Sequence, residues 1–239
     1  MQSARTLMTN CELELLLLHA LPLDGTMWAE QMELLPGATY APTLYSFGDR
    51  IESWAEKALA LTKAARLVVV GCSVGGSCAL EVAALAPDRV AALVLIGTKA
   101  ARRLDPAYHA SALGTLHERG LGAAWGEFWE PLFAKRASPR AIEGAKRISM
   151  RQPLTDIARG VTVFHTRPSR SDILSNFQGP VVIVTGSEDA APGIETSRMQ
   201  AEIAQHGRLH IIPDCGHYVP IERPKAINSI IREVIAAYA

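Results

Sequence analysis

The 239-residue sequence has few of the features that would assign it to several large classes of proteins. Its four cysteines, Cys11, Cys72, Cys78 and Cys215, include no C-x-x-C pair, so neither a disulfide framework nor a zinc site is expected. With 24 basic and 24 acidic residues the net charge is zero, which provides no basic surface for nucleic acid. The first apolar stretch is interrupted by Glu14 and is too short for a signal peptide or a membrane span. We therefore expect a soluble, cytoplasmic protein with reduced thiols that binds neither nucleic acid nor membranes.

Motifs for common cofactors and metals are also missing. No G-x-G-x-x-G follows the first apolar run, and neither a P-loop nor an H-E-x-x-H pattern occurs. A dinucleotide-binding protein is therefore set aside, and we expect no cofactor and no metal ion. The oligomeric state leaves no signal in the sequence.

What the sequence does contain is an alternation of strand-like and helix-like segments. Runs rich in Val, Ile and Leu without strict alternation are typical of strands that are covered on both faces. Such runs occupy residues 13–18, 38–44, 66–71, 90–97 and 180–186, and a shorter, more polar one occupies 208–213. Helical patterns occupy residues 51–65, 77–86 and 224–239. This order predicts the α/β class, with a mostly parallel sheet flanked by helices.

One long block departs from the alternation. Between residues 99 and 175 only VTVF, at 161–164, is strand-like, and this block is too long for a plain connection. Its helical segments are residues 106–120, 121–133, 138–150 and 152–160. We predict a helical cap over residues 99–175, inserted into a core formed by residues 1–98 and 176–239.

The stretch GCSVGG, residues 71–76, surrounds a single serine with glycines at the junction of a predicted strand and a predicted helix. Gly71-x-Ser73-x-Gly75 matches the nucleophile elbow, a sharp turn that exposes a serine hydroxyl. The two glycines are needed because the incoming strand and the outgoing helix nearly touch there. The alternative is a glycine-rich turn with a buried, hydrogen-bonded serine.

A serine nucleophile requires a histidine base and a carboxylate that orients it, expected in the chain order Ser, Asp or Glu, His. His217 follows the last strand-like run in a loop that contains Gly216, and it is our candidate for the base. Asp189 follows the strand at 180–186 and is our candidate for the carboxylate, with Glu188 as the alternative. The remaining downstream histidines occupy helices, a strand or a surface turn: His109, His117, His165, His206 and His210.

Acyl transfer also requires amide donors for the oxyanion. One is expected from Val74, the residue after the nucleophile, at the start of the helix. For the second we choose Leu21, in the loop HALPLDG, because Pro22 after it has no N–H and stiffens the loop. An ordinary loop at the end of a strand is the alternative for HALPLDG.

Four stretches resemble the α/β-hydrolase superfamily, and in particular its small capped esterases and lactonases. They are LLLHALPLDGTMW, VVVGCSVGGSCALEVAALAPDRVAALVLIGT, VVIVTGSEDAAPG and IIPDCGHYVPIERP, and the cap is most similar to that of 3-oxoadipate enol-lactonase-like proteins. In this resemblance Asp189 and His217 match the family's aspartate and histidine. Ala20 stands where the family usually has glycine, and the segment after residue 44 is short. Few residues precede His19, so the sheet is expected to be truncated at its N-terminal edge.

These observations predict a serine hydrolase that cleaves a small, largely apolar carboxylic ester or lactone through an acyl-enzyme on Ser73. Carbon–carbon bond hydrolysis and a perhydrolase reaction would use the same residues and remain open. So does another class of function, a ligand receptor or silent scaffold with a hydrolase fold. The candidates for the pocket lining are Trp28, Trp125 and Trp129; packing against the core is the alternative for the aromatic residues of the cap.

Overall fold

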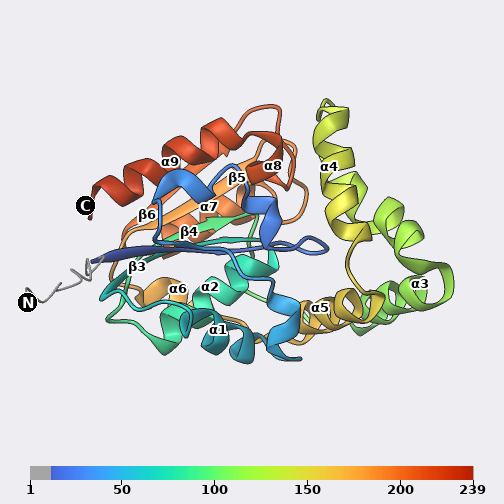
Figure 1. Ribbon diagram of the computed structural model, residues 1–239, viewed down its shortest axis with the longest axis horizontal. Helices are drawn as coiled ribbons and strands as arrows, with labels where there is room; N and C mark the ends of the chain where they lie inside the picture. Colours follow the sequence, from blue (N-terminus) through green and yellow to red (C-terminus); the bar gives the residue numbers. More distant parts are fainter. Residues whose placement is uncertain (1–11, 239) are drawn as a thin grey trace, which may run out of the picture.

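The computed structural model describes residues 12–238, and its centre is a parallel β-sheet of six strands (Figure 1). The strands follow the order β2-β1-β3-β4-β5-β6, and each neighbouring pair is parallel. Their bounds are β1 Leu13–Leu18, β2 Thr39–Tyr40, β3 Arg66–Cys72, β4 Val90–Ile96, β5 Val181–Gly186 and β6 Gly207–Ile212. The predicted α/β class and mostly parallel sheet are confirmed.

The central strands are buried because helices cover both faces of the sheet. Every residue of β1 and of β5 is buried, which explains their apolar runs without alternation. Figure 1 shows α9 (Pro224–Ala236) on one face, and α1 (Ile51–Leu59) and α2 (Val74–Leu85) on the other. The other core helices are α7 Ile194–Ile203 and α8 Val219–Glu222, with short 3₁₀ turns η1 Gly25–Trp28, η2 Met32–Leu34 and η3 Leu44–Phe47.

Glu14 interrupts the apolar sequence of β1, and its side chain has a structural partner. Its carboxylate accepts hydrogen bonds from the amides of Lys63 and Ala64, at 2.7 and 2.9 Å. These bonds anchor the connection that enters β3. The helix predicted over 51–65 therefore ends earlier, with α1 at Leu59.

β2 is shorter than the predicted strand at 38–44. Pro42 has no N–H to donate to a sheet, and Leu44 begins the 3₁₀ turn η3. The amide of Leu44 donates instead to Nε2 of His19, at 2.8 Å. This segment thus turns back towards the end of β1 rather than lengthening the sheet.

The chain between β4 and β5 is helical. Its elements are α3 Pro106–Ala124, the π-helical turn η4 Trp125–Trp129, η5 Glu130–Leu132, α4 Pro139–Met150, α5 Leu154–Thr166 and α6 Ser171–Asn176. In Figure 1, α3, α4 and α5 gather beyond one end of the sheet. VTVF, the strand-like run at 161–164, lies inside α5 because Ile157, Val161 and their neighbours bury one helical face. α6 packs against α2, where Arg170 pairs with Glu81 at 2.7 Å.

At the N-terminal edge, β1 is the first strand of the described residues and β2 covers its free side. Cys11 and the segment before it lie outside the described residues. Between residues 12 and 238 no helix has both the length and the apolar character to cross a membrane.

Candidate active site

Ser73 lies at the turn between β3 and α2 with a backbone conformation that residues other than glycine rarely adopt. Its φ is 55° and its ψ is −117°. A Cβ added to Gly71 would lie 2.3 Å from the carbonyl oxygen of Gly75, and one added to Gly75 would lie 2.1 Å from that of Leu18. Only glycine fits at both positions, so the sequence around Ser73 is dictated by the tightness of this turn.

Asp189 and His217 meet at the same end of the sheet, from the loops that follow β5 and β6. Nδ1 of His217 lies 3.1 Å from each carboxylate oxygen of Asp189, and both side chains are buried. Burial opposes ionisation of Asp189, but the imidazole of His217 and the amide of Ala191 outweigh it and lower the pKa of this carboxyl. The pair leaves Nε2 of His217 available as a base when Nδ1 carries the proton that faces Asp189.

The neighbouring acids have other partners. Glu188 is exposed and accepts a hydrogen bond from the amide of Lys135 at 2.9 Å. Asp214 is exposed and has a positive φ of 48° in the turn after β6. Of these three carboxylates, Asp189 is the one in contact with His217.

Ser73 and His217 line one cavity of about 480 Å³. The core contributes Leu21, Ser73, Ala191 and His217 to its lining. The segment between β4 and β5 contributes the other residues: Lys99, Ala101, Arg102, Arg103, Asp105, Tyr108, Ala112, Phe128, Trp129, Leu132, Val161, Phe164, His165 and Arg167. The cavity thus lies between the sheet and the helices that follow β4, which is where a cap would bury a small substrate.

Of the three tryptophans considered for the pocket, one lies in this lining. Trp129 lines the cavity, whereas Trp28 is fully buried in the core and does not line it. Trp125 is also outside the lining; its Nε1 donates to Glu130 at 2.6 Å. His165 is a lining residue that the sequence did not single out. It stacks on His109 with ring centroids 4.9 Å apart, and its pKa is lowered to about 4, chiefly by burial.

The loop that contains Leu21 is held by three polar side chains. His19 is fully buried, accepts from Leu44 at Nε2, and lies 3.2 Å from the carbonyl of Ala20 through Nδ1. Because a backbone amide can only donate, the proton of this imidazole must be on Nδ1. Desolvation lowers the pKa of His19 to about 4, so it is neutral at neutral pH.

Two tyrosines fix the rest of this loop. The hydroxyl of Tyr45 donates to the carbonyl of Leu23 at 2.6 Å, and that of Tyr218 donates to the carbonyl of Leu21 at 3.0 Å. The amides of Leu21 and Val74 donate to no group within residues 12–238. Leu21 lines the cavity, and Val74 begins α2 directly after Ser73.

Glu222 anchors the loop that carries His217. This buried carboxylate accepts from the amides of Gly216, Tyr218 and Ala134, at 3.1, 3.3 and 3.0 Å. Burial raises its pKa. The amide of His217 itself donates to Leu132 at 2.8 Å. His217 is thus tied both to its own loop and to the chain next to η5, a link that no spacing in the sequence indicates.

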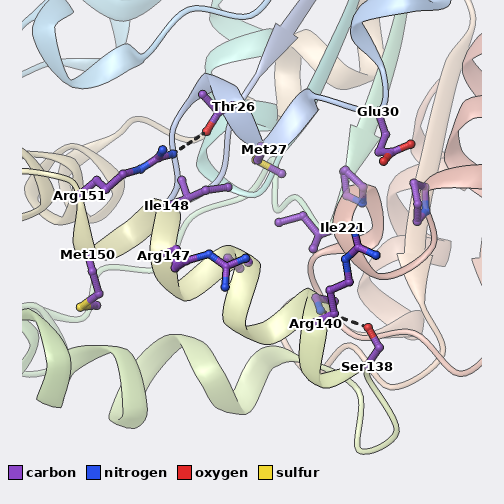
Figure 2. A pocket seen from close by; sticks show the side chains of 15 residues that line it. Thr26, Met27, Glu30, Ser138, Arg140, Arg147, Ile148, Met150, Arg151 and Ile221 are labelled. Atoms are coloured by element: carbon purple, nitrogen blue, oxygen red, sulfur yellow. Dashed lines mark hydrogen bonds between the residues drawn. The ribbon is translucent and has the colours of Figure 1, made fainter.

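A second, larger groove of about 690 Å³ lies between η1, α4 and α8 (Figure 2). Arg140 and Arg147 of α4 point along it together with Arg151, the residue after the helix, which donates to Thr26 at 3.3 Å. Its lining contains none of Ser73, Asp189 and His217, so we assign the candidate active site to the smaller cavity. Between residues 12 and 238 no three His, Cys, Asp or Glu side chains are grouped so as to hold a metal ion.

Comparison with known proteins gives a family and several relatives. The sequence model of a family described as "Alpha/beta hydrolase family" matches residues 15–230. A thermophilic esterase from Thermogutta terrifontis, solved with malate bound, is 28% identical with a TM-score of 0.85, over 94% of this chain and 90% of that one. The enol-lactonase from Burkholderia xenovorans LB400 is 19% identical with a TM-score of 0.81, over 95% of this chain and 92% of that one, and shows the fold. The 2-hydroxymuconate semialdehyde hydrolase of Pseudomonas sp. (strain CF600) is 23% identical over 93% of this chain and 86% of its own.

Proposed function

Because the chain belongs to the alpha/beta hydrolase family, we propose that it is a serine hydrolase that cleaves a small, largely apolar carboxylic ester or lactone. One observation carries this proposal. A serine in a strained turn and a buried Asp–His pair, separated by more than a hundred residues, line or adjoin a single cavity. The esterase relative, at 28% identity, supports ester hydrolysis in particular.

In the proposed reaction Ser73 is the nucleophile and His217 the general base. His217 takes the hydroxyl proton through Nε2 as the serine oxygen attacks the carbonyl carbon. Asp189 accepts a hydrogen bond from Nδ1–H and, remaining ionised, stabilises the imidazolium that forms. The bond between the carbonyl carbon and the alkoxy oxygen then breaks, and the alcohol leaves with the proton from His217.

The acyl-enzyme is resolved by water. His217 removes one proton from the water molecule, whose oxygen attacks the acyl carbon, and Ser73 regains its proton as the acid leaves. The amides of Leu21 and Val74 would stabilise the oxyanion in both steps. Removing one such donor costs about 10²–10³ in rate, so the support of the Leu21 loop by Tyr45 and Tyr218 is part of the proposal.

The decisive test is Ser73→Ala, with kcat measured on esters of graded chain length and on simple lactones. We expect kcat to fall by about 10⁴ or more and labelling by a fluorophosphonate probe to disappear. The matched control is Ser77→Ala, because Ser77 lies in the first turns of α2, just after Ser73. Its hydroxyl is buried and has no hydrogen-bond partner within residues 12–238. Retention of most esterase activity in Ser73→Ala would contradict the mechanism; failure of the wild-type protein to be labelled would favour a silent scaffold.

The relative named 2-hydroxymuconate semialdehyde hydrolase favours a second candidate, hydrolysis of a carbon–carbon bond. The two candidates share the nucleophile, so Ser73→Ala does not separate them. Comparison of kcat/KM for 2-hydroxymuconate semialdehyde with that for esters and lactones does. A clear preference for the semialdehyde would assign the second candidate.

The organisation into a core (residues 1–98 and 176–239) and a cap (99–175) is part of the same proposal. It is supported by the position of α3, α4 and α5 beyond the sheet (Figure 1), and by the cavity lining, most of which comes from the segment between residues 99 and 167. A cytoplasmic location is proposed as well. Its support is three free, buried thiols, those of Cys72, Cys78 and Cys215.

A further inference from the structure

The cavity at Ser73 has a strongly unbalanced charge. Four of its lining residues carry a positive charge and one carries a carboxylate. The cations are Lys99, Arg102, Arg103 and Arg167, and the acid is Asp105. None of the four forms an ion pair with a carboxylate in the part of the chain that the structure describes. An apolar ester alone gives no reason for this arrangement.

Arg167 is the most informative of these cations because it is buried. Only 6% of its surface is exposed. Its guanidinium lies over the ring of Phe164, 4.0 Å from the centroid, and donates to the carbonyl of the same residue. Burial and the nearby Arg102 lower its pKa to about 10, so it stays protonated at neutral pH. A buried charge is normally paired, and here no carboxylate of the described chain supplies the pair.

Arg102 extends this positive region. It is half-buried, and its guanidinium donates to the carbonyl of Arg167 at 2.7 Å, which places the second cation beside the first. Asp105 is already engaged, because its Oδ1 accepts the amide of Tyr108 at 2.9 Å as the N-terminal cap of α3. Elsewhere, half-buried arginines such as Arg159 and Arg170 do have carboxylate partners.

We infer that Arg167, with Arg102 beside it, binds a carboxylate carried by the substrate. The substrate is therefore an ester or lactone that has a free carboxylate away from the bond that is cleaved. A planar guanidinium matches a carboxylate through two parallel hydrogen bonds, and burial strengthens both. Phe128, Trp129 and Leu132 in the same lining would contact the apolar part of this molecule. That the bound molecule is an ester or lactone rests on the proposed function. That Arg167 binds a carboxylate does not depend on it.

Two pairs of isosteric esters test it, each pair differing only in the replacement of a carboxylate by an isopropyl group. Monomethyl succinate against methyl 4-methylpentanoate places the charge on the acyl side. Acetoxyacetate against isobutyl acetate places it on the alcohol side. For the wild-type protein we expect kcat/KM of the charged ester to exceed that of its neutral partner about ten- to hundredfold in one pair, the range for a charge-assisted hydrogen bond.

In Arg167→Gln this ratio of charged to neutral kcat/KM should fall by about the same factor, and Arg167→Lys should give an intermediate ratio. Arg119→Gln is the matched control, because Arg119 is an exposed arginine of α3 that pairs with Glu127 outside the cavity lining. If Arg167→Gln does not fold, as judged by its thermal transition, Arg102→Gln takes its place. A wild-type ratio near one in both pairs, or a ratio that survives both substitutions, would overturn the inference.

A binding measurement separates this inference from the proposed reaction. If the wild-type protein hydrolyses none of the four esters, the proposed function fails, and calorimetric titrations with monomethyl succinate and with acetoxyacetate still decide the carboxylate site. Binding that weakens at least tenfold in Arg167→Gln supports the site. Equal binding by the two proteins, or none by either, refutes it.

Discussion

Gly97, directly after β4, is the position where one added methyl group would disturb the candidate site most directly. Its φ is +56°, and a Cβ built there would lie 2.8 Å from Nδ1 of His217 and 3.2 Å from Oδ2 of Asp189. Ordinary contacts begin at about 3.4 Å, so in Gly97→Ala the imidazole must move by about 0.6 Å. The substitution therefore acts on the Asp–His pair without removing any polar group.

Two effects of Gly97→Ala have separate magnitudes. Alanine in the left-handed region costs about 1–2 kcal/mol of folding free energy wherever it occurs. Displacement of His217, the proposed base, is the second effect. A misplacement of about 1 Å can cost 10² in rate, so a tenfold to hundredfold loss of kcat/KM is expected. Gly37→Ala isolates the first effect, because Gly37 has a φ of +75° and nothing within 4 Å of its added Cβ.

The assay combines urea denaturation with kcat/KM on the best ester from the screen. Both variants should be destabilised by a similar amount, and only Gly97→Ala should lose activity. Equal activity of the two variants would refute the reasoning. The Asp189–His217 pair would then either tolerate the displacement or take no part in catalysis.

Two further predictions concern Asp189 and His19. Asp189→Asn should lower kcat by about 10⁴, because an amide cannot stabilise the imidazolium of His217 or hold its tautomer. The control Glu188→Gln should leave kcat within a fewfold of the wild-type value. Similar kcat values for the two variants would remove Asp189 from the mechanism. In the folded protein His19 stays neutral until the pH falls to its pKa of about 4, whereas in the unfolded chain it is protonated below about pH 6.5. The free energy of unfolding therefore falls as the pH drops from 6.5 to 4, by about 3 kcal/mol at most. In His19→Gln, urea denaturation from pH 7 to pH 4 should show a pH dependence smaller by about this amount, and an unchanged dependence would mean that His19 does not titrate as inferred.

Several features of this protein could be read from local sequence because they depend on neighbours along the chain. The apolar runs predicted the buried strands because a strand covered on both faces tolerates little polarity. Gly71 and Gly75 predicted the turn at Ser73 because their hydrogens face backbone atoms a few residues away or on the adjacent strand. Where a local rule competed with packing it failed: VTVF has a strand-like composition, yet it is helical in α5 because its face is buried together with Ile157.

The choice among nearby acids and the polarity of the cavity could not be read in this way. Glu188 and Asp189 are adjacent and chemically alike, and only the direction of the loop after β5 places one against His217 and the other against Lys135. Likewise, nothing in the spacing of Arg102 and Arg167 shows that they lie side by side.

The linear order of residues thus determined the type of fold, the tight turn at Ser73 and the chain order of its candidate partners, because propensity, burial pattern and steric room act over short distances. Which side chains share a cavity, which acid faces His217 and which buried cation has no carboxylate partner among residues 12–238 were decided by folding. These properties depend on loops that come from distant parts of the chain, and their relative positions follow from packing rather than from sequence separation.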